Sequence, residues 1–304
     1  MAQAVMTGYV AFGYSSETTS ANATASGMGV DDAEINFAIA EDIEGLGKLS
    51  ATMGFISGGR GDTATGRDTT IKLTTASGTA VTMGTTNGAS YLTGGVAAVG
   101  TNYNWDLSGK LFSDRTTTDA VSVKIPLMEG VSVSVAHSEA GTGYATGSGA
   151  AGNGTEQRYN TASLDYAAGA LAVNAGYRAY DNTTASSADS SNTRNRASAS
   201  YDLGIAKIGA GYESTQYMYG NSKTDSLLGV NLPVGGTLSL GVQFAQQSTS
   251  GNASAASNYN RNGYLLGMNY TLSKQTYLAA HYYSYDGGTT VNPSGYGVFL
   301  YKGF

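Results

Sequence analysis

The chain has 304 residues with 43 glycines, 22 tyrosines, no cysteine and a formal net charge of −6. The absence of cysteine excludes a disulfide framework and a thiolate zinc site, and the negative charge argues against a nucleic-acid-binding protein. Charged residues make up 12% of the chain, against about 25% in soluble domains, and no apolar run approaches the roughly 18 residues of a spanning helix.

Alternation of apolar and polar residues predicts β-strands along the whole chain, from the first residues to the last. Stretches such as 262–272 and 276–285 carry apolar side chains on one face and polar ones on the other. The predicted strands are, in chain order, 4–14, 32–43, 49–55, 69–74, 79–84, 121–125, 131–137, 158–166, 171–180, 194–201, 206–214, 224–232, 237–247, 262–272, 276–285 and 295–304.

The connections between these strands alternate between short turns and long polar segments, one of which we expect to run from about residue 15 to residue 30. About 16 strands, an even number, would bring both chain ends to one side, as in a transmembrane antiparallel β-barrel. We therefore expect an all-β barrel that forms one domain over 1–304, with short turns in the periplasm and long loops outside. A mean hydropathy of −0.17 fits, because half of each strand faces water.

Tyrosines gather near the predicted strand ends, where an aromatic girdle would lie at the membrane surface. The tyrosines that we assign to this girdle are Tyr14, Tyr166, Tyr177, Tyr180, Tyr201, Tyr212, Tyr270 and Tyr285.

Four short motifs resemble one family. Residues 270–277 read Tyr-Thr-Leu-Ser-Lys-Gln-Thr-Tyr and resemble the Tyr-x-Leu-Ser-Lys-Arg-Thr turn of Gram-negative general porins, closest to the β-proteobacterial trimeric porins. Phe304 resembles the final Phe that the outer-membrane assembly machinery reads in that family. The chain departs from the pattern at Gln275, and at Thr85, where the family has Arg. The remaining matches are Gly78, Thr79, Thr82 and Gly84, and, around the first acidic turn, Glu41, Asp42, Gly45, Leu46, Lys48 and Ala51.

The longest stretch without alternation is 85–119, after the fifth predicted strand. A loop of this length is usually functional or disordered. The resemblance implies that it is the third loop, folded into the lumen as the constriction of the channel. An extra hairpin on the surface is the alternative.

Pore selectivity depends on the bore and on the charges that line it. Strand parity places several charged residues toward the lumen, and loop 85–119 adds others. Because the lumen set is more basic than the whole chain, we expect a weak anion preference. The pore-lining and constriction candidates are Lys72, Lys124, Arg178, Arg194, Arg196, Asp106, Lys110, Asp114 and Arg115. Parity also puts Arg261, Asp165, Glu213 and Asp225 on the lumen side.

No constellation for catalysis or metal binding emerges from the sequence. His137 and His281 lie near strand ends among apolar or Tyr residues, so we expect both at the membrane interface rather than as ligands or bases. Cysteine nucleophiles and the phosphate-loop, zinc-helix and nucleophile-elbow motifs are missing. We expect no enzyme, no cofactor and no metal.

These observations favour a general-diffusion porin of the cell outer membrane that passes ions and small hydrophilic solutes. The resemblance implies a homotrimer in contact with outer-membrane lipid and lipopolysaccharide, with no nucleic-acid partner. No basic and apolar leader begins the chain, so we expect a signal peptide to have been removed. Two alternatives stay open: a substrate-specific or plugged porin-like protein with a surface-interaction role, and a soluble secreted β-sandwich binding protein.

Overall fold

A computed structural model describes residues 4–58, 63–87, 107, 110–111, 117–140, 157–181, 191–218, 220–251, 258–288 and 291–304. Within these residues no helix has the length and apolar character to cross a membrane.

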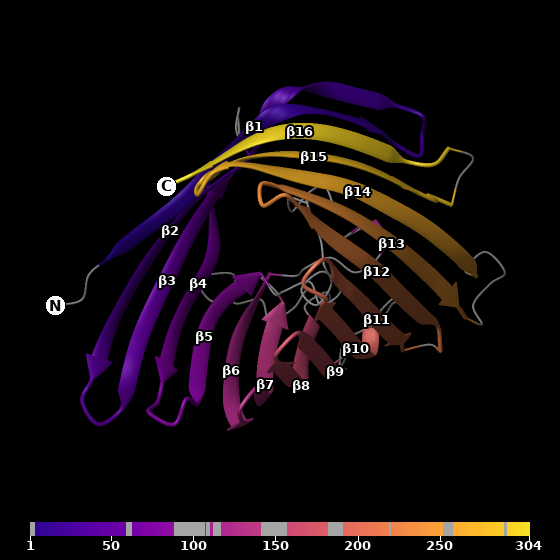
Figure 1. The fold of residues 1–304 in the computed structure, drawn as a ribbon. Coiled ribbons are helices and arrows are strands. Elements are labelled where there is room, and N and C mark those ends of the chain that lie inside the picture. Colours follow the sequence, from indigo (N-terminus) through magenta and orange to yellow (C-terminus); the bar gives the residue numbers. More distant parts are fainter. Residues whose placement is uncertain are drawn as a thin grey trace.

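Sixteen antiparallel strands form a closed barrel in which each strand pairs with its neighbours in sequence, and β1 pairs with β16 (Figure 1). The strands are β1 (Val5–Thr18), β2 (Thr24–Ile43), β3 (Gly47–Ser57), β4 (Thr65–Thr74), β5 (Ala80–Asn87), β6 (Thr117–Met128), β7 (Val131–Ala140), β8 (Gln157–Ala168), β9 (Leu171–Asp181), β10 (Ser191–Asp202), β11 (Lys207–Tyr217), β12 (Ser222–Val234), β13 (Leu238–Ser250), β14 (Tyr259–Ser273), β15 (Thr276–Tyr285) and β16 (Ser294–Gly303).

The predicted all-β barrel and its strand order are confirmed, but several predicted boundaries are wrong. Residues 15–30 are not a loop, because β1 continues to Thr18 and β2 begins at Thr24. Hydroxyl side chains of these two residues meet at 2.9 Å, and strand pairing by the backbone needs no apolar face. The predicted loop 85–119 is likewise too long at both ends, since β5 includes 85–87 and β6 begins at 117.

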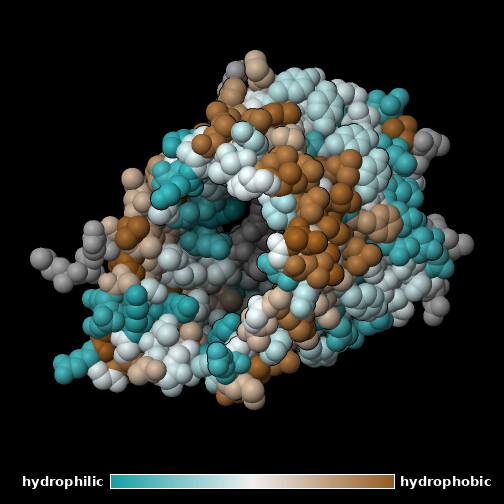
Figure 2. Space-filling model, in the orientation of Figure 1, coloured by the Kyte–Doolittle hydropathy of each residue, from teal (hydrophilic) through white to brown (hydrophobic). Residues whose placement is uncertain are grey.

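The outer face of the barrel is apolar and the inner face is polar. Large apolar side chains of alternate residues are exposed on the outside, as at Leu240, Val242 and Phe244 of β13. Their exposure contradicts the soluble sandwich, in which these residues would pack together away from water. Figure 2 shows patches of brown apolar side chains on the surface and a central hollow with teal hydrophilic side chains along its left side.

The tyrosine girdle is only partly as predicted. Tyr14, Tyr166, Tyr177, Tyr201, Tyr212 and Tyr270 are exposed on the outer face. Tyr180 and Tyr285 instead point inward, because each has the opposite parity to the outward residues of its strand. Proximity to a strand end is therefore not enough to assign a tyrosine to the girdle.

The barrel closes where the two ends of the chain meet. Gly8 and Phe304 exchange backbone hydrogen bonds of 3.1 and 2.9 Å. A Cβ at Gly8 would lie 2.6 Å from the Phe304 ring, so only glycine leaves room for this terminal aromatic. The C-terminal residue is thus held by the first strand rather than trailing from the last.

Candidate functional site

A basic arc lies on the inner wall of β9 and β10. Arg178 and Arg194 are register partners, and Arg196 follows on the same face of β10. Glu213 of β11 is 1% exposed and forms ion pairs with Arg194, at 3.4 Å, and with Arg196. One buried carboxylate therefore orients two guanidinium groups and leaves an excess of positive charge on this wall.

Aromatic side chains on β8 and β9 support the same arc. The Arg178 guanidinium lies 3.9 Å from the ring centre of Tyr159, and Arg194 lies 5.7 Å from the ring centre of Tyr180. Stacking on an aromatic face stabilises a guanidinium in one plane. The inward-facing Tyr180 is thus part of the inner wall of the barrel.

Lys72 and Lys124 stand on the inner face of β4 and β6, and both are exposed. Lys124 pairs with Asp165 of β8 at 3.3 Å, across the strand between them. Lys72 has no ion-pair partner among the described residues. These lysines add exposed positive charge to a wall otherwise rich in Ser and Thr.

Asp225 and Arg261 belong to a buried network on β12 to β14. Gln247 donates to Asp225 at 3.0 Å and accepts from the Tyr259 hydroxyl at 3.2 Å. The Arg261 guanidinium lies 4.0 Å from the Tyr259 ring centre. Asp225 is fully buried and forms an ion pair with Lys223 at 3.5 Å.

An acidic arc on β1 and β2 was missed by the sequence analysis. Phe12 pairs with Val30 and Ala11 with Asp32, so Asp31 is the extra residue of a bulge. The bulge turns both Asp31 and Asp32 inward, where they accept hydrogen bonds from Tyr301 at 2.9 Å and Tyr9 at 2.6 Å.

Two more carboxylates extend this acidic arc. Glu34 pairs with Arg67 at 3.2 Å, and Glu17 accepts a hydrogen bond from Tyr283. Asp32 and Glu34 have the opposite parity to the outward Ile35, so alternation along the strand could have predicted that both point inward. The bulge at Asp31 left no signal in the sequence.

The acidic and basic arcs face each other. In the closed ring, β2 and β10 are separated by the same number of strands in both directions. The two arcs therefore occupy opposite walls of the barrel interior, and their opposite charges produce a transverse electric field across it.

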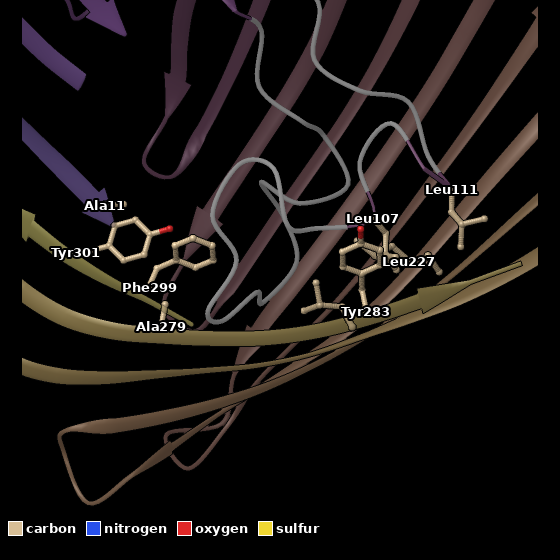
Figure 3. Close-up of a cluster of buried hydrophobic side chains, with 10 residues drawn as sticks. Ala11, Leu107, Leu111, Leu227, Ala279, Tyr283, Phe299 and Tyr301 are labelled. Carbon is tan, nitrogen blue, oxygen red and sulfur yellow. The ribbon is translucent and has the colours of Figure 1, made fainter. Parts of the chain in front are cut away.

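Three described residues of the predicted constriction loop contact the inner wall. Leu107 and Leu111 are completely buried among Leu227, Leu265, Tyr283 and other inward apolar side chains (Figure 3). Gln247 donates to the backbone carbonyl of Leu111 at 2.9 Å. The Lys110 ammonium lies 4.8 Å from the ring centre of Tyr283.

The other loop candidates, Asp106, Asp114 and Arg115, lie outside the described residues. The folding of the loop as a whole into the lumen therefore stays a prediction.

The two histidines lie on opposite faces of the barrel, and the structure contradicts the prediction for His281. His137 is half exposed on the outer face near the end of β7. His281 is instead buried on the inner face, stacked on Phe299 at 5.8 Å, so it is not an interface residue. Within the described ranges no group of three potential ligands could hold a metal ion.

Comparison with known proteins decides the family. The model of the Gram-negative porins matches residues 1–290. The chain belongs to the Gram-negative porins. This porin is thus an outer-membrane channel protein, and the resemblance of its turn motifs is confirmed.

Solved structures share the fold of this porin. The anion-selective porin from Comamonas acidovorans has a TM-score of 0.71 at 16% identity, with 100% of both chains covered. The trimer form of OmpT from Vibrio cholerae has a TM-score of 0.73 at 12% identity, covering 100% of this chain and 99% of that one. Salmonella typhi OmpF in complex with daunomycin has a TM-score of 0.76 at 12% identity, covering 99% and 97%. A search of curated proteins found no match.

Proposed function

We propose that this porin is a general-diffusion channel, one domain over 1–304, that passes ions and small hydrophilic solutes down their gradients without a catalytic cycle or cofactor. The observation that carries the proposal is the closed barrel, apolar outside and charged inside, with a hydrophilic hollow (Figure 2). A passive channel needs only a bore and lining charges.

We propose a weak anion preference for the same channel. Most described carboxylates of the inner wall are held by Tyr or Arg, whereas Lys72 and Lys124 are exposed. A similar fold is found in a porin described as anion-selective. The pore-lining roles of Lys72, Lys124, Arg178, Arg194 and Arg196 are part of this proposal.

We infer that the constriction is formed by the loop that contains Leu107 to Leu111, as the burial of those two leucines against the inner wall supports. The same apolar cluster favours the second candidate, a plugged or substrate-specific channel. The two differ in whether ions flow through the folded barrel.

We propose a homotrimer, because aromatic residues are distributed unevenly over the outer face of the barrel. Strands β2 to β7 contain no Tyr or Trp, although aromatic girdles mark lipid-facing strands. On β2 to β5 the outer face instead presents Met28, Phe37, Met53, Phe55 and Ile71. We assign this arc, β2 to β5, to the contact between subunits; a trimer of similar fold is known for OmpT.

Single-channel conductance in a planar bilayer, with the reversal potential under a salt gradient, tests the function. We expect stable steps in groups of three, and a reversal potential with the sign of anion selectivity. Folded, membrane-inserted protein that carries no current would contradict the diffusion channel and favour the plugged alternative. A cation-selective potential would overturn the anion preference alone.

A further inference from the structure

The first hairpin extends well beyond the strand that follows it. β1 and β2 pair with each other up to Thr18 and Thr24. β3 pairs with β2 only as far as Ser57, the partner of Ala33. Residues 24–32 of β2 therefore continue past the end of the pairing with β3, over about 30 Å of strand at about 3.3 Å per residue.

One edge of this extension has no strand beside it in the described part of the chain. On one side β2 pairs with β1, which pairs in turn with β16 as far as Thr18 and Ser294 (Figure 1). On the other side no described strand pairs with residues 24–32. About half of the backbone N–H and C=O groups of an antiparallel strand point to each side, so about half of those in 24–32 face this free edge. Residues 21–29 are all exposed, which shows that the described chain does not cover the edge.

Other strands that reach far toward the longer connections are paired on both sides. Ser222, at the start of β12, pairs with Gln216 of β11 and with Ser250 of β13. Thr249 of β13 likewise pairs with Tyr259 of β14. The free edge of β2 is thus a local step in the rim of the barrel rather than a general property of its strand ends.

The sequence of the free edge does not protect it. Proteins usually protect exposed strand edges with Lys, with Pro or with a bulge. Residues 18–30 contain no charged residue and no Pro, and the bulge between β1 and β2 lies at Asp31, at the base of this stretch. A Cβ at Gly27 or Gly29 would meet no atom within 4 Å. An uncharged edge with open space around it can accept another strand through its backbone.

The position of the edge indicates which chain can reach it. It belongs to β2 and looks toward the side of β3, so it lies above the arc β2 to β5 that we assign to the subunit contact. Met28, on this stretch, is 77% exposed and is one of the apolar residues of that arc. Identical chains carry no like charges that would repel one another along residues 18–30. A neighbouring subunit therefore fits this edge in both position and charge.

We propose that the free edge of β2, residues 24–30, receives an extended stretch of a second copy of this chain, so that the sheet of one subunit continues into its neighbour. The inference rests on the proposed trimer. Threefold symmetry makes the contact head-to-tail, so the edge meets a different stretch of the neighbour rather than its own counterpart. Main-chain hydrogen bonds give such a contact its affinity and its direction, which the apolar arc alone does not supply.

Hydrogen–deuterium exchange of the intact trimer, read by mass spectrometry, tests the proposal. We expect the backbone amides of residues 24–30 to exchange at least about tenfold more slowly than unprotected amides. Free exchange of about half of them would overturn the inference. Native mass spectrometry of the same sample reports the oligomer separately. Trimers with a free edge refute strand addition alone, whereas a monomeric protein refutes the proposed trimer together with it.

Gly27→Lys places a charge on the edge where the space is open, so the barrel should fold and the neighbouring strand should be excluded. We expect about half of the amides of residues 24–30 to return to the unprotected rate, and the trimer to dissociate at a lower temperature. Ser250→Lys is the matched control, because Ser250 is exposed on a strand that is paired on both sides. Unchanged protection in Gly27→Lys, or an equal effect of Ser250→Lys, would overturn the proposal.

Discussion

Among single residues, Glu213 has the largest influence on the basic arc, because it forms ion pairs with two of its arginines. Its carboxylate lies behind Arg194 and Arg196 and is almost completely buried. A buried ion pair is costly to break from one side, because the partner charges are left without compensation. This residue therefore sets both the charge of the wall and part of its stability.

Glu213→Gln is expected to shift the reversal potential further toward anion selectivity and to lower the free energy of unfolding by about 2 kcal/mol. Reversal potential and urea unfolding measure the two effects. Asp165→Asn is the matched control, because its ion pair with Lys124 is exposed. It should shift selectivity in the same direction and cost less than about 1 kcal/mol. If both variants lowered the free energy of unfolding equally, the burial of the Glu213 carboxylate would not account for its contribution to stability.

At the scale of elements, tyrosine–carboxylate pairs join the first hairpin to the last two strands, where the barrel closes. Tyr283 of β15 reaches Glu17, and Tyr301 of β16 reaches Asp31. Neither contact depends on neighbours in sequence. Side chains on strands from opposite ends of the chain thus reinforce the backbone pairing of β1 with β16.

Tyr301→Phe is expected to lower the free energy of unfolding by about 2 kcal/mol, because it removes a hydrogen bond to a carboxylate and leaves that acceptor inside. Urea unfolding of the refolded barrel measures the loss. Tyr296→Phe provides the control on the same strand, since Tyr296 is exposed on the outer face. If both variants lowered the free energy of unfolding equally, the Tyr301 hydroxyl would have no special role in stabilising the barrel closure.

The segment at Leu107 to Leu111 is a second element-scale contact. Truncation of a buried leucine costs about 2–5 kcal/mol locally, so Leu111→Ala should weaken the attachment of this segment to the wall. We expect larger current fluctuations in single-channel recordings. Leu228→Ala, on the exposed outer face, should leave the current steady. A quiet current in both variants would argue against this segment as part of the constriction.

The outer face divides, at the scale of the whole molecule, into a tyrosine-rich arc and an arc without Tyr or Trp. Tyr rings suit the lipid–water interface, where one end of the ring is apolar and the other meets water. An arc that contacts other subunits has no such requirement. The asymmetry of the girdle therefore supports β2 to β5 as the subunit contact.

Ile71→Lys on that arc is expected to reduce the trimer to folded monomers, seen as a shifted band on unheated gels. Val242→Lys places the same charge on the opposite arc and should leave the trimer intact. Each lysine costs about 2–4 kcal/mol if it faces the middle of the bilayer, so retained heat-modifiability is checked in both. If the Ile71→Lys variant still formed intact trimers, the subunit contact would not lie on β2 to β5.

The sequence by itself determined the strands and their parity. Alternation with a period of two is local, so it identified all sixteen strands and the inward Lys72, Arg178 and Arg196. It failed where local composition is ambiguous, since the polar residues after Tyr14 pair as strand through their backbone. It also failed at Asp31, because a bulge shifts parity without leaving a composition signal.

Only the tertiary structure decided which inward residues meet. Closure of the ring sets β2 opposite β10 and brings Tyr283 and Tyr301 to the first hairpin. It also places Leu111 against β12 to β15. These contacts join residues far apart in the chain, and their geometry depends on strand number and register together. Alternation specifies the direction of each side chain, whereas closure of the whole barrel determines its partner.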